Sequence, residues 1–391
     1  MSIAHIERKH AILSASGSKR WLTCTPSAQL EQEFPEQKSE YAEEGTFAHD
    51  LAALHLSRQL GQLTKRSFET QHKSVITHKY YSQEMSEHIE NYVDIVLERV
   101  NKARVITKDT IVLIEQKLDF SAWVPDGFGT GDVVIISDGA IEIIDLKYGK
   151  GVPVSAEDNT QMSLYALGAI SQYGILYDID IVRMTIVQPR LDNVSTEEIS
   201  ANKLLEWGNE YVRPRATMAI MGEGEFISGE HCQFCRVRFT CRARAEFNLE
   251  LAKYDFKKST LSIEEIADIL ARAEELQKWA SEVQTFALDQ AENHGVKYPG
   301  WKLVEGKANR KYTDENEVAQ ALISEGLEEE KIYKPKEILG ITAMEKVLGK
   351  KQFSKLLGHL VIRPQGKITL APDSDKRPEI NSVASAREDF K

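Results

Sequence analysis

Two aspartates and a lysine in the stretch 129–151 have the residue types and spacing of a divalent-cation site. The stretch reads GTGDVVIISDGAIEIIDLKYGKG, in which Asp138-Gly139 separates two runs rich in valine and isoleucine. Asp-Gly is a favoured two-residue hairpin turn, so this pattern predicts antiparallel strands at about 131–137 and 140–147.

The turn sets the register of this hairpin. If Ser137 faces Ala140, the sixth pair from the turn places Asp132 opposite Asp145. Their β-carbons would then lie roughly 5 Å apart, where like charges repel. A cation such as Mg²⁺, which binds carboxylates together with water and phosphate oxygens, would turn this repulsion into attraction.

Lys147 follows Asp145 by two residues, so its side chain should point to the same face of the strand. Acids and lysines are also ordinary where a strand pair ends in solvent. The same acid-x-Lys pattern recurs without such a hairpin at Glu36–Lys38, Glu115–Lys117 and Asp255–Lys257. The predicted register, and not the pattern alone, therefore favours a site.

Other elements must position this hairpin. The apolar patterns predict helices at 41–61 and 82–103, a strand at 111–118, a helix at 158–174 and a strand at 180–188. Elements in this order predict an α/β fold with a mixed central sheet flanked by helices.

Four polar residues on these elements are further candidates. His49 lies in an apolar helix and is either a site residue or a core histidine. Glu115 lies in an apolar strand and needs a partner, which Lys117 or Arg99 could also provide by ion pairing. Gln161 and Tyr165 are four residues apart and share one helix face.

The four cysteines have the spacing of metal or cluster ligands. Cys232, Cys235 and Cys241 follow the pattern Cys-x2-Cys-x5-Cys, and Cys24 is a remote fourth residue. In a reducing compartment, where disulfides are rare, four thiolates suit either zinc or an iron–sulfur cluster. Arginines among them form the most basic patch of the chain, suited to phosphate or to a solvated turn around a metal: Arg236, Arg238, Arg242 and Arg244.

The bulk properties suit a soluble globular protein. The chain has 391 residues, enough for two or three domains, and a net charge of −11, which argues against non-specific binding to nucleic acid. The first residues lack the features of a signal peptide, and no stretch is long and apolar enough to span a bilayer. We therefore expect a cytoplasmic location and no membrane association.

The C-terminal third is predicted to be an accessory region. After a helix expected at 199–221 in the core, a long helix is expected at 262–294. It is followed by a small mixed domain with strands near 299–312 and 361–370 and helices at 316–324 and 342–348. The predicted organisation is an N-terminal helical region at 1–105, a core at 106–230, a three-cysteine segment at 231–260 and an accessory region at 261–391.

Taken together, these motifs resemble a known family. His49, Asp132, Asp145-Leu146-Lys147 and the Gln161/Tyr165 helix, with one cysteine before them and three after, look like the RecB-like branch of the PD-(D/E)xK nucleases. More narrowly, roughly residues 12–245 resemble members with an iron–sulfur cluster, such as the CRISPR-adaptation nuclease, helicase-nuclease repair subunits and related phage proteins.

The resemblance implies a restriction-endonuclease-like core and a role for each motif residue. Asp132, Asp145, the carbonyl of Leu146 and the ring of His49 would bind Mg²⁺ or Mn²⁺. Lys147 would orient or deprotonate the attacking water. By the same resemblance, Gln161 and Tyr165 would position the motif or contact DNA, and Glu115 is a secondary catalytic candidate.

For the cysteines, the resemblance implies a [4Fe-4S] cluster held by Cys24, Cys232, Cys235 and Cys241, with zinc as the alternative. Joining Cys24 to Cys232 would close a loop of about 200 residues, which constrains the unfolded chain by roughly 5 kcal/mol. The cluster would thus clasp the two ends of the core.

The function implied is a metal-dependent DNA exonuclease acting on ends or single strands in phage or prophage recombination or repair. Its expected partners are DNA, an annealing protein or helicase, and further copies of the chain. The alternatives are a non-catalytic DNA-binding or scaffolding protein with the same fold and cluster, and a nuclease that acts on RNA.

Overall fold

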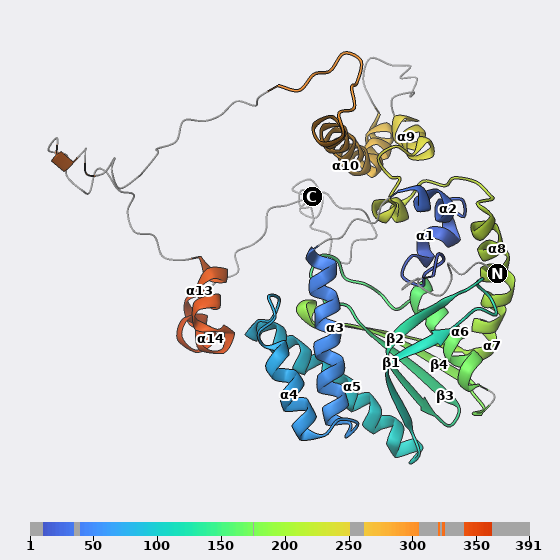
Figure 1. The fold of residues 1–391 in the computed structure, drawn as a ribbon, viewed down its shortest axis with the longest axis vertical. Helices are drawn as coiled ribbons and strands as arrows, with labels where there is room; N and C mark the ends of the chain where they lie inside the picture. The colour runs from blue at the N-terminus through green and yellow to red at the C-terminus, as the bar shows by residue number, and fades with distance from the viewer. Residues whose placement is uncertain are drawn as a thin grey trace, which may run out of the picture. The chain divides into compact units, whose positions relative to one another are not determined.

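The computed structural model describes residues 11–34, 40–174, 176–250, 262–304, 320, 323–324 and 340–361. The chain divides into two units, Met1–Phe286 and Ala287–Lys391. Figure 1 shows that the first unit contains a central sheet with helices on both faces. The fold is therefore the mixed α/β arrangement expected.

Five strands form one mixed sheet in the order β1-β2-β3-β4-β5. Strands β3 and β4 run parallel, and the other neighbours are antiparallel. The strands are β1 (Ile111–Asp119), β2 (Phe128–Ser137), β3 (Ala140–Leu146), β4 (Ile181–Gln188) and β5 (Asn193–Ser200).

The predicted hairpin is confirmed as β2 and β3. Ser137 pairs with Ala140, and the register continues as expected to Val133 and Ile144. Gly139 has a φ of +73°, in the left-handed region that glycine adopts without strain. The Asp-Gly turn thus fixes the pairing from which the site is built.

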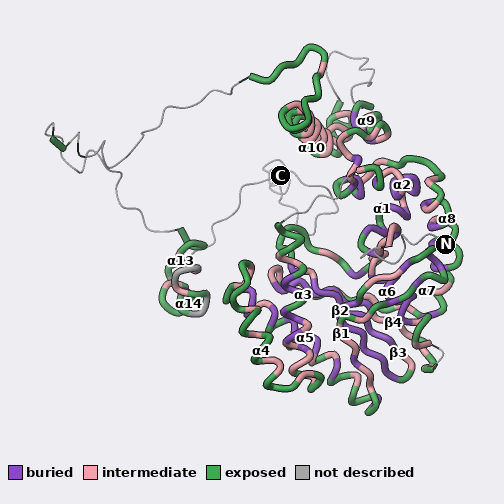
Figure 2. Tube along the Cα trace, viewed as in Figure 1, coloured by how far each residue is buried: buried purple, intermediate pink, exposed green. Residues whose placement is uncertain are grey.

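Two apolar cores lie on opposite faces of the sheet, visible as buried segments in Figure 2. One face packs against α3 and α5, and the other against α6, α7 and α8. The helices of these layers are α1 (Ser18–Thr23), α2 (Ser27–Leu30), α3 (Glu40–Gln59), α4 (Lys65–Val75), α5 (Gln83–Ile106), α6 (Thr160–Tyr173), α7 (Ala201–Trp207) and α8 (Arg213–Met221).

Several elements differ from the expectation. Strand β5 was not predicted, because most of its residues are polar and give no apolar pattern. In the structure its side chains alternate between half-buried and exposed. The helix expected at 199–221 begins after β5 and contains a π-helical turn, Gly208–Val212, between α7 and α8. Helices α4 and α9 (Arg242–Leu249) were also not predicted.

The long helix expected at 262–294 is confirmed as α10 (Ile263–His294). The helix expected at 342–348 is α13 (Ile341–Leu348), which packs against α14 (Lys350–Leu357). Residues 299–304 form no strand. The remainder of that expected strand pair, most of the helix at 316–324 and the strand at 361–370 lie outside the described residues. Among the helices that are described, none has the length and apolar character to cross a membrane.

Gly129 in β2 lies beneath the ring of Tyr165 on α6. A β-carbon at this glycine would lie 2.5 Å from Cε1 of Tyr165, whose ring is buried and must shift to accommodate it. We therefore expect Gly129→Ala to lower the free energy of unfolding by about 1–3 kcal/mol in urea titrations.

The control for this substitution is Gly45→Ala in α3, where nothing lies within 4 Å of an added β-carbon. That change should raise stability by about 0.5–1 kcal/mol, since alanine favours the helix. Equal effects of the two substitutions would contradict the packing described.

Candidate active site

Asp132 at the end of the β2–β3 ladder connects three elements. Its Oδ1 atom lies 3.0 Å from Nδ1 of His49 on α3. Its Oδ2 atom accepts a hydrogen bond of 2.6 Å from the backbone nitrogen of Leu146 on β3. The structure thus brings together the predicted residues His49 and Asp132, and Leu146 contributes its N–H to Asp132.

The predicted face-to-face pair of Asp132 and Asp145 is not formed. The β2–β3 ladder ends at Val133 and Ile144, one pair earlier, because the Asp132 carboxylate takes the N–H of Leu146. The two aspartates instead contact helices on opposite faces of the sheet: Asp132 contacts α3, and Asp145 contacts α6. Their charges still interact, since Asp132 is among the groups that raise the pKa of Asp145.

Glu115 replaces Asp145 in the closest group of potential ligands. Among the described residues, one ligand atom each from His49, Glu115 and Asp132 lie within 4.8 Å of one another. These three residues could hold a metal. They come from α3, β1 and β2, so three elements converge there.

An unusual backbone conformation accompanies the position of Glu115. Its φ is +49°, a left-handed value that costs a non-glycine residue on the order of 1–3 kcal/mol and is found preferentially at functional sites. Val112 packs into the core beside α3, whereas Leu118 packs into the core beside α6. In a regular strand, Val112 and Leu118 would lie on the same face of the sheet. The side chains of β1 therefore switch faces around Glu115.

Neither of the ion-pair partners considered for Glu115 holds it in this structure, and its side chain is exposed. Arg99 lies 3.7 Å from Glu142, with which it forms an ion pair. The ammonium of Lys117 lies 4.3 Å from the centre of the Phe128 ring. Both candidate partners for Glu115 are thus engaged elsewhere.

Lys147 belongs to a second polar group beside α6. Its Nζ atom lies 3.0 Å from Oδ2 of Asp145 and donates a 2.9 Å hydrogen bond to Oε1 of Gln161. The Gln161 amide donates to Oδ1 of Asp145 and to the hydroxyl of Tyr165 at 3.4 and 3.1 Å. The structure brings these four predicted residues into one network.

The charge state of Lys147 limits its role. Burial acts to lower its pKa, but the carboxylate of Asp145 outweighs burial and raises the pKa above its usual value. Lys147 is therefore an ammonium at neutral pH. Of the two roles expected, orienting a water suits an ammonium, and deprotonating one does not.

His49 and Glu115 both hold protons more tightly than usual. Burial disfavours the charge of His49, yet the charge and hydrogen bond of Asp132 outweigh it and raise its pKa to about 9. Part of the Glu115 side chain is accessible to solvent, but burial of the carboxyl and the charge of Asp132 raise its pKa to about 7. A cation bound by His49, Glu115 and Asp132 would have to displace protons from His49 and Glu115.

All four cysteines line one pocket, although Cys24 and Cys232 are far apart in sequence. Cys24, Cys232 and Cys235 are buried, and Cys241 is half-buried. Burial, followed by the charge of Glu31, raises the pKa of the Cys235 thiol to about 12. This thiol is therefore protonated when no metal is bound.

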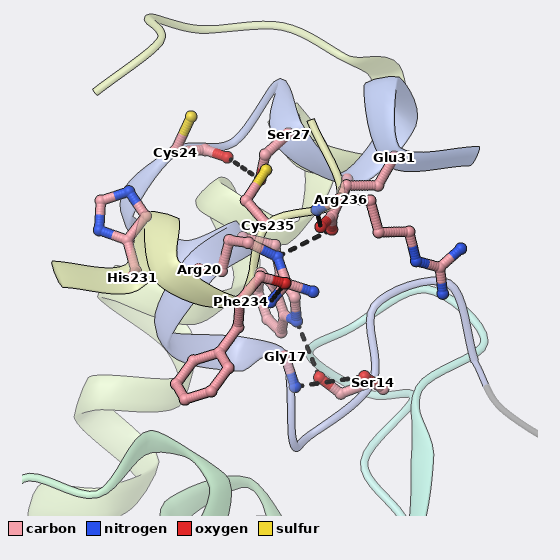
Figure 3. A network of polar contacts seen from close by, with 12 residues as sticks. Ser14, Gly17, Arg20, Cys24, Ser27, Glu31, His231, Phe234, Cys235 and Arg236 are labelled. Carbon is pink, nitrogen blue, oxygen red and sulfur yellow. Dashed lines mark hydrogen bonds and ion pairs between the residues drawn. The ribbon is translucent and has the colours of Figure 1, made fainter. Parts of the chain in front are cut away.

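Glu31 fastens the N-terminal segment to the three-cysteine segment (Figure 3). Its Oε2 atom accepts a 2.8 Å hydrogen bond from Arg20, and its Oε1 atom accepts one of 2.8 Å from the backbone nitrogen of Arg236. Arg20 also donates to the carbonyl of Phe234 at 3.3 Å. These contacts hold the cysteines of both segments around the pocket.

Comparison with known proteins gives a family for this arrangement. A family model described as "Protein of unknown function (DUF2800)" matches residues 10–378. The chain belongs to the DUF2800 family. One solved structure, titled "Crystal structure of SSO0001", is 14% identical to this DUF2800 chain over 58% of its length and 96% of the other chain, with a TM-score of 0.21. At this TM-score the likeness supports no conclusion about fold or function.

Two of the four arginines in the patch of this DUF2800 protein, Arg238 and Arg244, are engaged within the protein and not presented for phosphate. Arg244 is fully buried, with 2.6 Å contacts to Glu275 and Glu282 of α10. Arg238 donates to the carbonyl of Cys235 and stacks on Phe239. These two arginines organise the cysteine segment and α10, and are not displayed for a ligand.

Sequence reasoning also missed Tyr92 of this DUF2800 protein. Tyr92 is fully buried on α5 and lines the same pocket as His49, Glu115 and Asp132. Its helical spacing with Ile89 and Val96 indicated a core residue, and that pattern contains no signal for a polar role.

Proposed function

We propose that this protein is a metal-dependent DNA nuclease of the RecB-like PD-(D/E)xK type, acting as an exonuclease. The observation that carries the proposal is the His49, Glu115 and Asp132 group next to β3, which contains Asp145 and is followed directly by Lys147. The two carboxylates suit Mg²⁺ or Mn²⁺, and the His49 imidazole would be an additional nitrogen donor. A lysine ammonium directly after the neighbouring strand suits a polyanionic substrate.

The chain's own residues would divide the work of hydrolysis. His49, Glu115 and Asp132 would hold the cation, which when bound would activate water and polarise the scissile phosphate. Lys147 would stabilise negative charge that develops on the phosphate. Gln161 would fix the Lys147 ammonium, and Asp145 would keep it protonated.

We further propose that the four cysteines hold a [4Fe-4S] cluster. One pocket is lined by cysteines from two segments that are distant in sequence, so a cluster bound there would join these two segments. Four thiolates suit a [4Fe-4S] cluster, and zinc is the alternative.

The decisive experiment is degradation of end-labelled DNA. Wild-type protein purified without oxygen should shorten single-stranded or duplex DNA from its ends with Mg²⁺ or Mn²⁺, and should be inactive with EDTA. A parallel RNA substrate tests the alternative specificity. Binding of DNA without shortening under both metals would reject the enzyme and favour the non-catalytic alternative.

Metal binding should release protons and strengthen as pH rises. At pH 7 the metal-free site holds about one proton on His49, whose pKa is about 9, and about half a proton on Glu115, whose pKa is about 7. Affinity for Mn²⁺ should therefore be higher at pH 8 than at pH 6. Calorimetry in buffers with different ionisation heats measures the release, and heats that do not depend on the buffer would contradict it.

A further inference from the structure

The hydroxyl of Tyr92 is a buried polar group without a partner. Tyr92 lies within α5 and is fully excluded from solvent. Within the described residues its Oη atom makes no hydrogen bond. A buried hydroxyl in this state is destabilising, and such groups are rare in native proteins, so its presence calls for a reason.

The pocket around Tyr92 supplies that reason. Tyr92 lines it together with His49, Glu115 and Asp132, and small apolar side chains of α3 form much of the rest. Burial, with the charges of Asp132 and other acids nearby, raises the pKa of Tyr92 well above its usual value. The hydroxyl therefore remains protonated and can only be satisfied by donating or accepting inside this pocket.

Glu115 is the acceptor in the group that is not already used. Both oxygens of Asp132 are engaged, one by His49 and one by the N–H of Leu146. No hydrogen bond within the described part of the chain occupies the Glu115 carboxylate. Glu115 is also the ligand at the solvent side of the group, so its carboxylate needs a restraint that Asp132 already has.

We propose that Tyr92 is a positioning residue of the metal centre, whose hydroxyl donates to the Glu115 carboxylate and holds it in place when the cation binds. This inference rests on the metal site of the proposed function, but not on DNA cleavage. Groups that hydrogen-bond to metal ligands orient them, and removing such a group commonly weakens metal binding about 10-fold or more.

The test is Tyr92→Phe, followed by Mn²⁺ affinity from the paramagnetic resonance signal of free Mn²⁺. We expect affinity to fall about 10-fold. The urea midpoint of the metal-free protein should stay the same or rise, because the substitution removes only an unsatisfied hydroxyl. A role in packing alone would give the opposite pattern, with a lower midpoint and unchanged affinity.

Two further variants make the result specific. In a Glu115→Gln background, Tyr92→Phe should change Mn²⁺ affinity much less than it does in wild type, because the acceptor has been altered. Tyr173→Phe, at a half-buried tyrosine on α6, should leave affinity unchanged. An equal effect of Tyr92→Phe with or without Glu115→Gln would overturn the inference.

The experiment also separates this inference from the nuclease proposal. Wild-type protein that binds Mn²⁺ but leaves DNA intact would reject the nuclease and leave the Tyr92 result valid. Wild-type protein that does not bind Mn²⁺ would overturn both.

Discussion

Asp132→Asn should reduce metal-dependent DNA hydrolysis by about a thousandfold or more, since it removes a charged ligand from the centre of the group. Asp132 contacts both His49 and the backbone of Leu146, so the change also weakens its contacts with α3 and β3. The measurement is the initial rate of end-label release at saturating Mn²⁺. Mn²⁺ affinity should fall in the same variant.

Lys147→Met separates loss of chemistry from loss of metal. We expect a comparable fall in hydrolysis with Mn²⁺ affinity largely retained, because Lys147 contacts Asp145 and Gln161 and lies outside the close ligand group. Asp109→Asn, an exposed carboxylate before β1, is the matched control and should keep full activity. Activity in Asp132→Asn close to that of this control would remove the basis of the enzyme proposal.

Cys24→Ser should abolish iron binding and destabilise the whole first unit. Wild-type protein purified without oxygen should be brown and contain about four irons per chain, and the variant should be colourless. Losing the link between Cys24 and the later cysteines releases a loop of about 200 residues, worth roughly 5 kcal/mol in the unfolded chain. The midpoint of thermal unfolding, measured without oxygen, should fall accordingly.

Thr23→Ser is the control for this variant, since the Thr23 hydroxyl donates to the carbonyl of Lys19 in its own helix, and serine retains a hydroxyl for this bond. It should retain iron and stability. A colourless wild-type protein with stoichiometric zinc would show that the cysteines bind zinc and not an iron–sulfur cluster. Cys24→Ser protein that keeps its full iron content would show that the remote cysteine is not a ligand.

The β2–β3 hairpin could be predicted because its turn and its alternation are both local. Asp138-Gly139 determines the pairing of Ser137 with Ala140, and the following pairs are then settled. Periodicity predicted that Lys147 lies on the same face as Asp145 and that Gln161 lies on the same face as Tyr165. The contact between Lys147 and Gln161 was suggested only by the family resemblance.

The exact ligand group could not be predicted, because it depends on contacts between distant segments. Asp132 leaves the ladder to bond to Leu146, and Glu115 joins His49 through a left-handed backbone that no residue pattern indicates. The sequence suggested phosphate binding or a solvated turn around a metal for Arg244, because its partners lie on α10, more than 30 residues away along the chain.

The burial of Arg244 determines where this protein can be shortened. Helix α10 has no buried side chain of its own, yet it supplies both carboxylates that neutralise the Arg244 guanidinium. A fragment that ends between α9 and α10 would keep Arg244 but remove both of its counter-charges together with the helix that carries them. A fragment that retains this ion-pair network should therefore extend beyond Glu282, far past the end of β5 at Ser200.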